Sequence, residues 1–434
     1  MPPGKRSLAG THLDQHSAVK GKGSGAGAEM GLLTALGISA LVYTGVIALA
    51  VQSAIYYRPV PDYTGTGGEA GMTKMREMAV DRVPLALQVA RFITVSLISA
   101  LCRMLMGLRN RVELVQDDNY KAMLRYWRRR PRGTGLITVS NHASSLDDPA
   151  LLAAISPYDV LLQPSRMRWS IATQDLVFPK GKTWIQAFMG AGQTLPIWRG
   201  GGIDQPLLLD MARQLAAGNW AHIFPEARVV QSGDLGQDPI TKRSEDELRR
   251  IGLLKWGVGK LIAHAPVEPI VVPFYHFGMV GVLPQHNKWV GDRSDINNYH
   301  NLVIDWLRPG KNQTVKVWFG ERLYFDDLIA AHEAKHGPLH KVTAAPIAGS
   351  WQQELEKWKS SESDRELYHQ LTDRIEEALL GLESRAKKDA QENPVQNMKL
   401  ACERCLAATP KGKIINLRNR TRAPYLRAQN ASGA

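Results

Sequence analysis

Residues 140–152, SNHASSLDDPALL, hold the side chains of this sequence that are best suited to proton transfer. The stretch contains His142 and, five residues later, the pair Asp147-Asp148. A neutral imidazole is a good base near pH 7 because its unperturbed pKa is about 6.5. A carboxylate hydrogen-bonded to the other ring nitrogen fixes the tautomer that the base needs and stabilises the imidazolium. We predict that His142 is a general base and that Asp147 orients it.

The second aspartate has a different neighbour, because Asp148 directly precedes Pro149. Aspartate is favoured at the N-cap of a helix and proline at the first helical position, so Asp148 is expected to cap a helix. Ser144 and Ser145 lie close to His142, but no G-x-S-x-G elbow surrounds either serine. A histidine and an aspartate without an enzymic nucleophile would activate a hydroxyl of the substrate directly, although this spacing alone is a weak signal.

The elements around this stretch predict an α/β fold. Leu136 to Val139, just before it, has the composition of a short buried strand, and Leu253 to Ala265 that of a helix. Further short apolar runs have the length of buried strands and occur at 221–224, 269–274 and 314–319. Short buried strands that alternate with helices argue for a mixed or mostly parallel sheet.

The N-terminal part of the chain predicts a membrane anchor. Residues 1–29 are rich in glycine and serine and have no apolar periodicity, so they are expected to be disordered. Residues 30–57 contain no charged side chain over 28 positions, and about 20 apolar residues span a bilayer. We predict a transmembrane helix over 30–57; the alternative is a buried helix of the core.

A second apolar stretch, 83–108, is interrupted by Arg91 and Arg103. The eleven residues between the two arginines are too few to span a bilayer. Apolar residues at helical spacing, with an arginine near each end, suit a helix that lies in the membrane interface. A core helix of the following domain explains the same pattern equally well.

The charge balance favours a polyanionic partner, because the formal net charge is +13. Residues 125–132 form a basic patch with Trp127, which fits phospholipid headgroups with the tryptophan at the interface. No zinc-finger, RNA-recognition or helix-turn-helix signature supports nucleic acid as the partner. Residues 386–434 are polar and basic and are expected to form a disordered tail that adds attraction to an anionic membrane.

The sequence predicts neither a metal site nor a cofactor. It has three cysteines, too few for a disulfide framework, and Cys402 and Cys405 form a single C-x-x-C pair. A zinc site needs about four ligands, and no second pair follows. GVGK at 257–260 lacks the frame of a nucleotide-binding loop and lies within a helical pattern.

The segment NHASSLDDP, residues 141–149, resembles the NHxSxxDDP block of the tafazzin family, within the glycerolipid acyltransferases that carry an H-x4-D motif. Five further blocks resemble tafazzin segments in the order of that family: RMRWSIATQ at 166–174, GQTLPIWRG at 192–200, GNWAHIFPEAR at 218–228, LKWGVGKLI at 254–262 and PFYHFGMVGVLP at 273–284. The resemblance covers about residues 110–385 and implies an α/β acyltransferase domain with a mixed central sheet flanked by helices.

The resemblance also implies roles for residues outside the opening stretch. Arg199 would hold the phosphate of the substrate, because a planar cation suits that group. Glu226 would position the glycerol backbone, with Phe224 and Pro225 shaping its loop. Pro273 would line the acyl site.

The sequence departs from the family pattern at two kinds of place. Ala227 stands where the family usually has glycine, which would cost stability if the position requires a positive φ. This departure affects the geometry of headgroup binding more than the chemistry. Residues 231–252 and 285–312 are polar and are expected to be surface insertions.

Tafazzins move an acyl chain from a phospholipid to a lysophospholipid without coenzyme A and remodel cardiolipin. The resemblance therefore implies a membrane-bound transacylase in which His142 deprotonates the free hydroxyl of a lysophospholipid. The implied compartment is a mitochondrial membrane facing the intermembrane space, with the endoplasmic reticulum membrane as the alternative. An acyl-CoA-dependent lysophospholipid acyltransferase would use the same residues and is the main alternative function. A basic scaffold with a decayed site is the non-enzymatic alternative, and the intact motif residues argue against it.

Overall fold

The computed structural model divides the chain into two compact units, 1–49 and 50–434, which are described separately, and it describes residues 25–61, 76, 78–80, 82–229, 254–283 and 312–392. The cysteine pair, the predicted insertions apart from residue 312, and most of the two predicted disordered ends lie outside these residues.

Two predicted boundaries are wrong within the described residues. Helix α1 (Gly25–Tyr56) begins inside the stretch predicted to be disordered, because alanine and glutamate there continue the helix. Helix α16 (Glu362–Glu392) continues into the predicted basic tail. It continues because Ala386 and Ala390 pack against Trp318 of the sheet.

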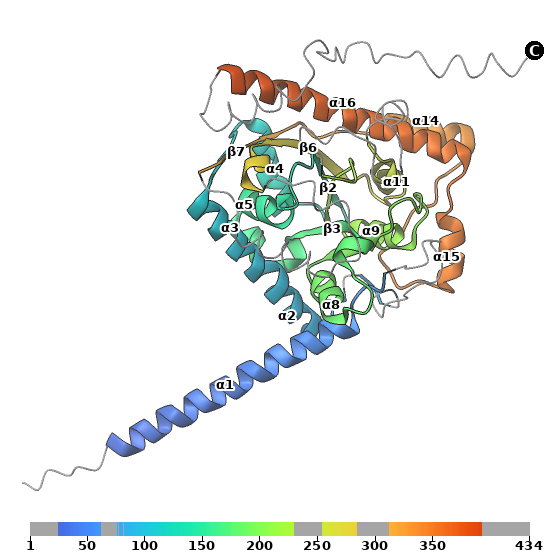
Figure 1. The fold of residues 1–434 in the computed structure, drawn as a ribbon. Helices are drawn as coiled ribbons and strands as arrows, with labels where there is room; N and C mark the ends of the chain where they lie inside the picture. The colour runs from blue at the N-terminus through green and yellow to red at the C-terminus, as the bar shows by residue number, and fades with distance from the viewer. Residues whose placement is uncertain are drawn as a thin grey trace, which may run out of the picture. The chain divides into compact units, whose positions relative to one another are not determined.

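The described residues hold one sheet of seven strands in the order β1-β7-β6-β2-β5-β3-β4 (Figure 1). Its strands are β1 (Arg111–Leu114), β2 (Leu136–Ser140), β3 (Arg168–Thr173), β4 (Thr194–Ile197), β5 (Trp220–Ile223), β6 (Ile270–Phe277) and β7 (Thr314–Phe319). All neighbouring strands pair in parallel except β6 and β7, which are antiparallel. The predicted mixed central sheet is therefore confirmed.

Helices cover both faces of this sheet. The longer ones in the second unit are α3 (Ile98–Arg109), α4 (Asp118–Arg128), α8 (Thr183–Ala191), α9 (Pro206–Ala216), α14 (Asp326–His336) and α15 (Trp351–Trp358), besides α16. The shorter ones are α2 (Leu85–Arg91), α5 (Leu152–Ile155), α6 (Tyr158–Leu161), α7 (Gln174–Val177), α11 (Gly257–Ala263) and α12 (Met279–Val282). Three segments have other helical geometries: η1 (Phe92–Leu97) and η2 (Asp147–Leu151) are π-helical, and η3 (Pro164–Arg166) is a 3₁₀ turn.

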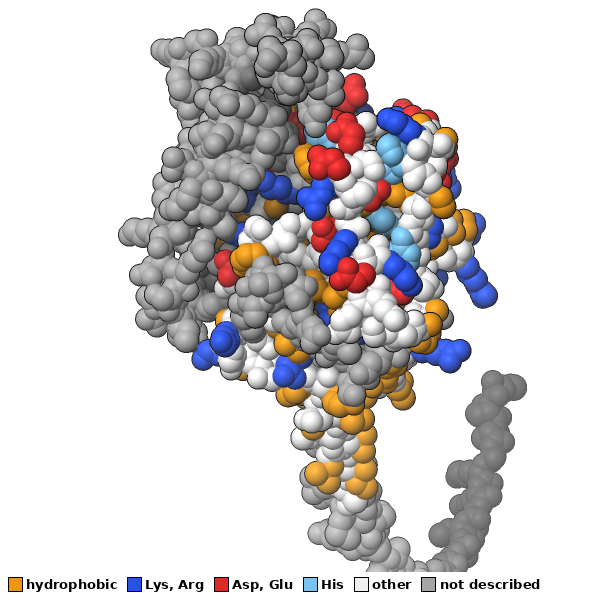
Figure 2. All heavy atoms as spheres, turned by 90° about the vertical axis from the view of Figure 1, so that its right-hand side faces the viewer, with side chains coloured by type: hydrophobic (Ala, Val, Ile, Leu, Met, Phe, Trp, Pro, Cys, Tyr) orange, Lys and Arg blue, Asp and Glu red, His pale blue; other side chains and the backbone are white. Residues whose placement is uncertain are grey.

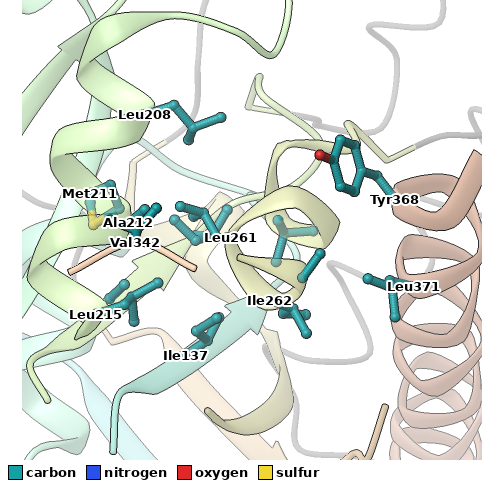
Figure 3. Packing of buried hydrophobic residues seen from close by; sticks show 14 of the residues in the cluster. Ile137, Leu208, Met211, Ala212, Leu215, Leu261, Ile262, Val342, Tyr368 and Leu371 are labelled. Atoms are coloured by element: carbon teal, nitrogen blue, oxygen red, sulfur yellow. The ribbon is translucent and has the colours of Figure 1, made fainter. Parts of the chain in front are cut away.

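The core has two layers because successive residues of a strand point to opposite faces of the sheet. In β2, Ile137 packs in the cluster formed with α9, α11 and α16, whereas Leu136 packs in the cluster formed with α3, α4 and α5. Figure 3 shows the first layer, in which Leu261 and Ile262 of α11 lie between α9 and α16. Because neighbouring side chains of β2 belong to opposite clusters, a shift by one residue would turn each of them to the other face of the sheet. This alternation fixes the register of β2.

The basic patch at 125–132 does not place its tryptophan at a membrane interface. Trp127 is 2% exposed and packs edge-on against Trp220 of β5 and Phe319 of β7. The prediction was wrong because a tryptophan on the inner face of an amphipathic helix is adjacent in sequence to arginines on the outer face. Here Arg125 and Arg128 are exposed on α4 while Trp127 faces the core.

Segments α2, η1 and α3 join into one continuous helix, Leu85–Arg109. Among the residues searched, this helix is long and apolar enough to cross a membrane, and Leu41–Tyr56 is a shorter apolar helix. Both of its internal arginines are bound by the domain. Arg91 stacks on the ring of Trp169 at 4.9 Å, and Arg103 donates a hydrogen bond to the carbonyl of Ala153 at 3.0 Å.

Candidate active site

The carboxyl ends of the parallel strands bring the predicted site residues to one edge of the sheet. His142 follows β2, Phe224 follows β5, and Arg199 follows β4. In open α/β sheets this edge is where ligands bind. The strand order places β5 next to β2 and β4 at the edge of the sheet. The predicted residues therefore form a close group, which includes His142 and Phe224, and a remote group, which includes Arg199.

The close group is centred on His142 and Asp147. Nδ1 of His142 lies 3.0 Å from Oδ2 of Asp147, as the sequence predicted. The same oxygen accepts hydrogen bonds from the backbone N–H groups of Ala143 at 2.7 Å and Ser144 at 2.9 Å. The Asp147 side chain is 1% exposed, whereas that of His142 is 18% exposed. The pairing at Nδ1 makes Nε2 the ring atom that can take a proton from a substrate.

The imidazole of His142 is held from a second side by the loop after β5. Its ring stacks on the ring of Phe224, with centroids 3.9 Å apart and planes at 15°. Beneath, the ring of the buried His222 meets Phe224 edge-on at 4.4 Å. Burial lowers the pKa of His222 well below its usual value, so this second histidine is neutral. It therefore supports the stack without adding charge.

The carboxyl of Glu226 joins the close group through the backbone of the base. Its Oε1 accepts a hydrogen bond from the N–H of His142 at 3.3 Å. The pKa of Glu226 is raised to about 8, chiefly by burial and also by the nearby carboxylate of Asp147, while the hydrogen bond from the His142 N–H lowers it. Glu226 is therefore mostly protonated at pH 7 and presents a neutral carboxyl group beside the base.

A tight turn carries Phe224, Pro225 and Glu226 into position. The N–H of Ala227 donates to the carbonyl of Phe224 at 3.0 Å, and the buried Pro225 accepts from the N–H of Lys255 at 2.8 Å. The backbone of Ala227 has φ of 56°, in the left-handed region. The concern raised by this departure from the family pattern is therefore confirmed, because alanine occupies a conformation that glycine adopts more easily.

Arg199 belongs to the remote group. Its loop, 198–202, is wrapped around the side chain of Gln205, which accepts from the N–H of Trp198 and donates to the carbonyls of Trp198 and Gly202 at 2.7–2.8 Å. Strands β2 and β4 are three strand positions apart, which corresponds to about 14 Å at the usual spacing. Arg199 is thus separated from His142 by three strand positions of the sheet.

Pro273 lies within β6 rather than at the end of a strand. It is buried and level with Val139 of β2, and its carbonyl accepts from the N–H of Gly320 at 2.8 Å. Gly320 is packed so closely that an added Cβ would lie 2.8 Å from the Pro273 ring. These contacts are with the core, and the acyl-lining role of Pro273 stays a prediction.

Asp148 does not cap a helix, contrary to the prediction from its place before Pro149. Its backbone has φ of −124° and ψ of 120°, and its carboxylate Oδ1 accepts hydrogen bonds from Nε of Arg168 at 2.9 Å and from a terminal guanidinium nitrogen. The side chain points toward Arg168 because that buried guanidinium requires a counter-charge. The two aspartates still have separate roles, as predicted, but the second is an ion-pair partner.

Three polar residues at the site were missed in the sequence. Arg168, Gln205 and His222 are all less than 9% exposed, and their partners lie on other elements or, for Gln205, seven residues away. Arg168 and His222 lie inside the blocks that resemble the tafazzin family, and this was the available signal. No rule of local spacing would have selected them.

Ser144 is not placed as a nucleophile. Ser144 is fully buried, and its Oγ accepts from the N–H of Leu146 at 3.2 Å. Within the ranges that the structure describes, no cluster of three or more His, Cys, Asp or Glu side chains is arranged to hold a metal ion. The pairing of His142 with Asp147 can perform general-base chemistry on a bound hydroxyl or amine.

Known proteins resemble the chain over this same region. Residues 121–276 match the Acyltransferase family. An N-acylphosphatidylethanolamine synthase of Arabidopsis thaliana is 31% identical over 306 residues, which cover 69% of this chain and 94% of the relative. A tafazzin of Drosophila melanogaster is 34% identical over 40% of this chain and 41% of its own length. A taffazin of Dictyostelium discoideum is 34% identical over 45% of this chain and 58% of its own.

Proposed function

The chain belongs to the tafazzin family of acyltransferases, and on this premise we propose that it moves a fatty acyl chain from a phospholipid to the free hydroxyl of a lysophospholipid. The observation that carries the proposal is the orientation of His142. Its Nδ1 faces the buried carboxylate of Asp147 at 3.0 Å and its side chain is 18% exposed, so Nε2 is the basic atom left for a substrate.

The proposed reaction uses His142 first as a base and then as an acid. Nε2 takes the proton of the acceptor hydroxyl while the hydroxyl oxygen attacks the ester carbonyl carbon of the donor phospholipid. The tetrahedral intermediate collapses, and the bond from this carbon to the glycerol oxygen of the donor breaks. The imidazolium returns its proton to that oxygen. The products are an acylated acceptor and a new lysophospholipid, and Asp147 stays ionised and stabilises the imidazolium throughout.

Glu226 and Arg199 support binding of a glycerophospholipid. A protonated Glu226 donates a hydrogen bond from its carboxyl group to a glycerol hydroxyl or ester oxygen next to the base. Arg199 supplies a guanidinium for the phosphate, about three strands away from the base. Pro273 contributes to the wall along the acyl chain.

The continuous helix Leu85–Arg109 supports docking on a membrane surface. One of its sides is buried against the domain, and the other exposes apolar side chains at helical spacing: Leu85, Phe92, Leu97, Leu101, Met104 and Leu108. Trp184 and Phe188 are also exposed on α8, which contacts α2 and η1. An exposed apolar helix face whose arginines are bound by the protein suits a helix lying in the interface. By contrast, the side of the molecule near α14 and α15 carries intermixed acidic, basic and histidine side chains (Figure 2).

We also propose how the protein is attached to the membrane and in which compartment it acts. Helix α1 would cross or anchor in the bilayer, since its side chains from Leu41 to Leu49 are apolar or small and exposed. The tafazzin resemblance implies mitochondrial membranes as the compartment and cardiolipin with monolysocardiolipin as the substrate pair, and we propose both for this chain. The basic tail would add attraction to anionic lipid, as predicted from its charge.

A second candidate is the N-acylation of phosphatidylethanolamine. It is favoured by the relative of that name, because the similarity extends over 94% of that protein. The same base would take a proton from the amino group instead of a hydroxyl, and the rest of the transfer would be unchanged. The two candidates therefore differ in the acceptor and not in the catalytic residues.

The test is a transfer assay with the full chain in lipid vesicles. A phospholipid labelled in its acyl chain is supplied without coenzyme A, together with either monolysocardiolipin or phosphatidylethanolamine as acceptor. Label in cardiolipin supports the first candidate, and label in an amide that resists mild alkaline hydrolysis supports the second. Transfer that occurs only after acyl-CoA is added would overturn both in favour of a CoA-dependent acyltransferase. The His142→Ala variant is the control for transfer that does not depend on the site.

A further inference from the structure

His276, near the end of β6, is a second histidine beside the carboxylate of Asp147. Its side chain is fully buried, and its Nε2 lies 3.5 Å from Oδ2 of Asp147. The same Nε2 lies 3.0 Å from the backbone carbonyl of Asn141. Oδ2 of Asp147 is therefore flanked by two imidazoles, Nδ1 of His142 at 3.0 Å and Nε2 of His276.

The partners of Nε2 determine the tautomer of His276. A backbone carbonyl and an ionised carboxylate only accept hydrogen bonds, so the hydrogen must be on Nε2. Nδ1 of His276 is buried and has no hydrogen-bond partner among the described residues. A proton there would bury an unsatisfied N–H, which is costly. Burial also lowers the pKa of His276, in agreement with a neutral ring.

Asn141 binds His276 through both its backbone and its side chain. Besides the carbonyl contact to Nε2, the Asn141 amide accepts from the N–H of His276 and donates to its carbonyl, each at 3.0 Å. This pairing continues the β2–β6 ladder beyond Ser140 and Phe274, where the strands end their regular register. Asn141 is also the residue directly before the base.

His276 thus contacts both ends of the loop 141–147, at Asn141 and at Asp147. The loop carries His142, and the bonds of Asp147 to the N–H groups of Ala143 and Ser144 brace it internally. Those bonds fix the loop to itself, whereas the bonds of His276 fix it to the sheet. The neutral ring of His276 lies against the carboxylate of Asp147 without competing, as a second cation would, for the charge that stabilises the imidazolium of His142.

We propose that His276 is a positioning residue for acyl transfer, which in its neutral Nε2–H form ties Asn141 and Asp147 to the sheet and keeps Oδ2 of Asp147 aligned on Nδ1 of His142. This inference rests on the proposed function of His142 and Asp147. A buried histidine that only fills space would need neither the defined tautomer nor a hydrogen bond from its ring to the loop that carries the base.

Two substitutions separate the hydrogen bond from the packing. His276→Phe keeps a buried ring without a donor, and His276→Gln places an amide nitrogen near the position of Nε2. In the vesicle assay we expect His276→Phe to lower kcat by about tenfold to a hundredfold, the range for supporting hydrogen bonds to catalytic groups, with KM nearly unchanged. We expect His276→Gln to recover most of the loss. His264→Phe, which removes an equally buried histidine bonded to Tyr368 instead, is the matched control and should keep kcat.

Wild-type kcat in a folded His276→Phe variant, while His142→Ala is inactive, would overturn the positioning role and leave the proposed function intact. Equal losses for the Phe and Gln variants would also overturn it. Activity in His142→Ala would instead contradict the proposed function. Should His276→Phe fail to fold, nitrogen NMR of the wild-type protein labelled with ¹⁵N-histidine decides the matter. The Nε2–H tautomer at pH 7 supports the proposal, and an Nδ1–H or charged His276 overturns it.

Discussion

The carboxylate of Asp148 pairs with the guanidinium of Arg168, twenty residues further along the chain. Arg168 is buried and the Asp148 side chain is 13% exposed, so this ion pair is largely removed from water. The pair joins the loop of the base to the start of β3 and is next to the Asp147–His142 pair in sequence. It therefore belongs to the support of the site and not to the cap of a helix.

The ion pair predicts a large effect of Asp148→Ala on stability. Removing one partner leaves an uncompensated buried guanidinium, and we expect the free energy of unfolding to fall by about 3 kcal/mol. Chemical unfolding in detergent micelles, followed by tryptophan fluorescence, measures this change. A double variant, Asp148→Ala with Arg168→Met, should recover part of the loss because it removes the stranded charge. A loss of only about 1 kcal/mol, the size of a helix-cap effect, would contradict the assignment.

The His142–Asp147 pair predicts that His142→Ala abolishes turnover. We expect the transfer rate to fall at least about a thousandfold, as for other enzymes that lose a general base held by a carboxylate. Binding to vesicles should not change, because the apolar helix face does not include His142. Sedimentation with vesicles and the acyl-transfer assay measure the two properties on the same sample. A variant with near wild-type turnover would refute the role of His142 as base.

The raised pKa of Glu226 predicts a pH dependence of stability. Burial raises the pKa from its ordinary value of 4.5 to about 8. Between these values the folded protein holds a proton that the unfolded chain has released, so stability falls as the pH rises, by at most about 1.4 kcal/mol per pH unit. Unfolding free energies at pH 5, 6, 7 and 8 measure the slope. Glu226→Gln should flatten it, because the amide does not titrate; equal slopes in the two proteins would show that Glu226 ionises normally.

The positive φ of Ala227 predicts that Ala227→Gly stabilises the protein. Alanine in the left-handed region costs about 1 kcal/mol relative to glycine. We expect the free energy of unfolding to rise by this amount, reduced by the greater conformational entropy of glycine in the unfolded chain. Ala217, with φ of −77°, is the matched control, and its change to glycine should destabilise the protein. Thermal unfolding of both variants provides the comparison, and the same sign of change in both would contradict the strain at Ala227.

Local patterns predicted the elements and the central pair of this site well. The strands at 136–139, 221–224, 269–274 and 314–319 all exist, because buried strands are continuous apolar runs. The pairing of His142 with Asp147 also followed from spacing within one short loop. The tafazzin resemblance correctly implied the mixed sheet.

Contacts between distant segments could not be predicted in the same way. Asp148 binds Arg168 and Asn141 binds His276, which is 135 residues away, and only the folded sheet brings these partners together. The burial of Trp127 depends equally on which side of α4 faces the sheet. An aspartate before proline has the same sequence pattern whether it caps a helix or forms an ion pair. A tryptophan among arginines has the same pattern whether it lies at a membrane interface or packs in the core.

The apolar side of the helix Leu85–Arg109 predicts that charges placed there weaken use of substrate in a membrane. Leu101 and Met104 are 40% and 52% exposed, one helical turn apart. Replacing both residues with glutamate removes two apolar side chains from the membrane interface and adds charges that anionic lipid repels. We therefore expect KM for vesicle substrate to rise at least about tenfold. Activity on short-chain substrate dissolved in detergent should stay the same, because both side chains are exposed on the outer side of the helix. The control is the pair Val267→Glu and Tyr324→Glu, which are 50% and 57% exposed away from this helix. Equal increases of KM in the two double variants would show that the helix face has no special contact with lipid.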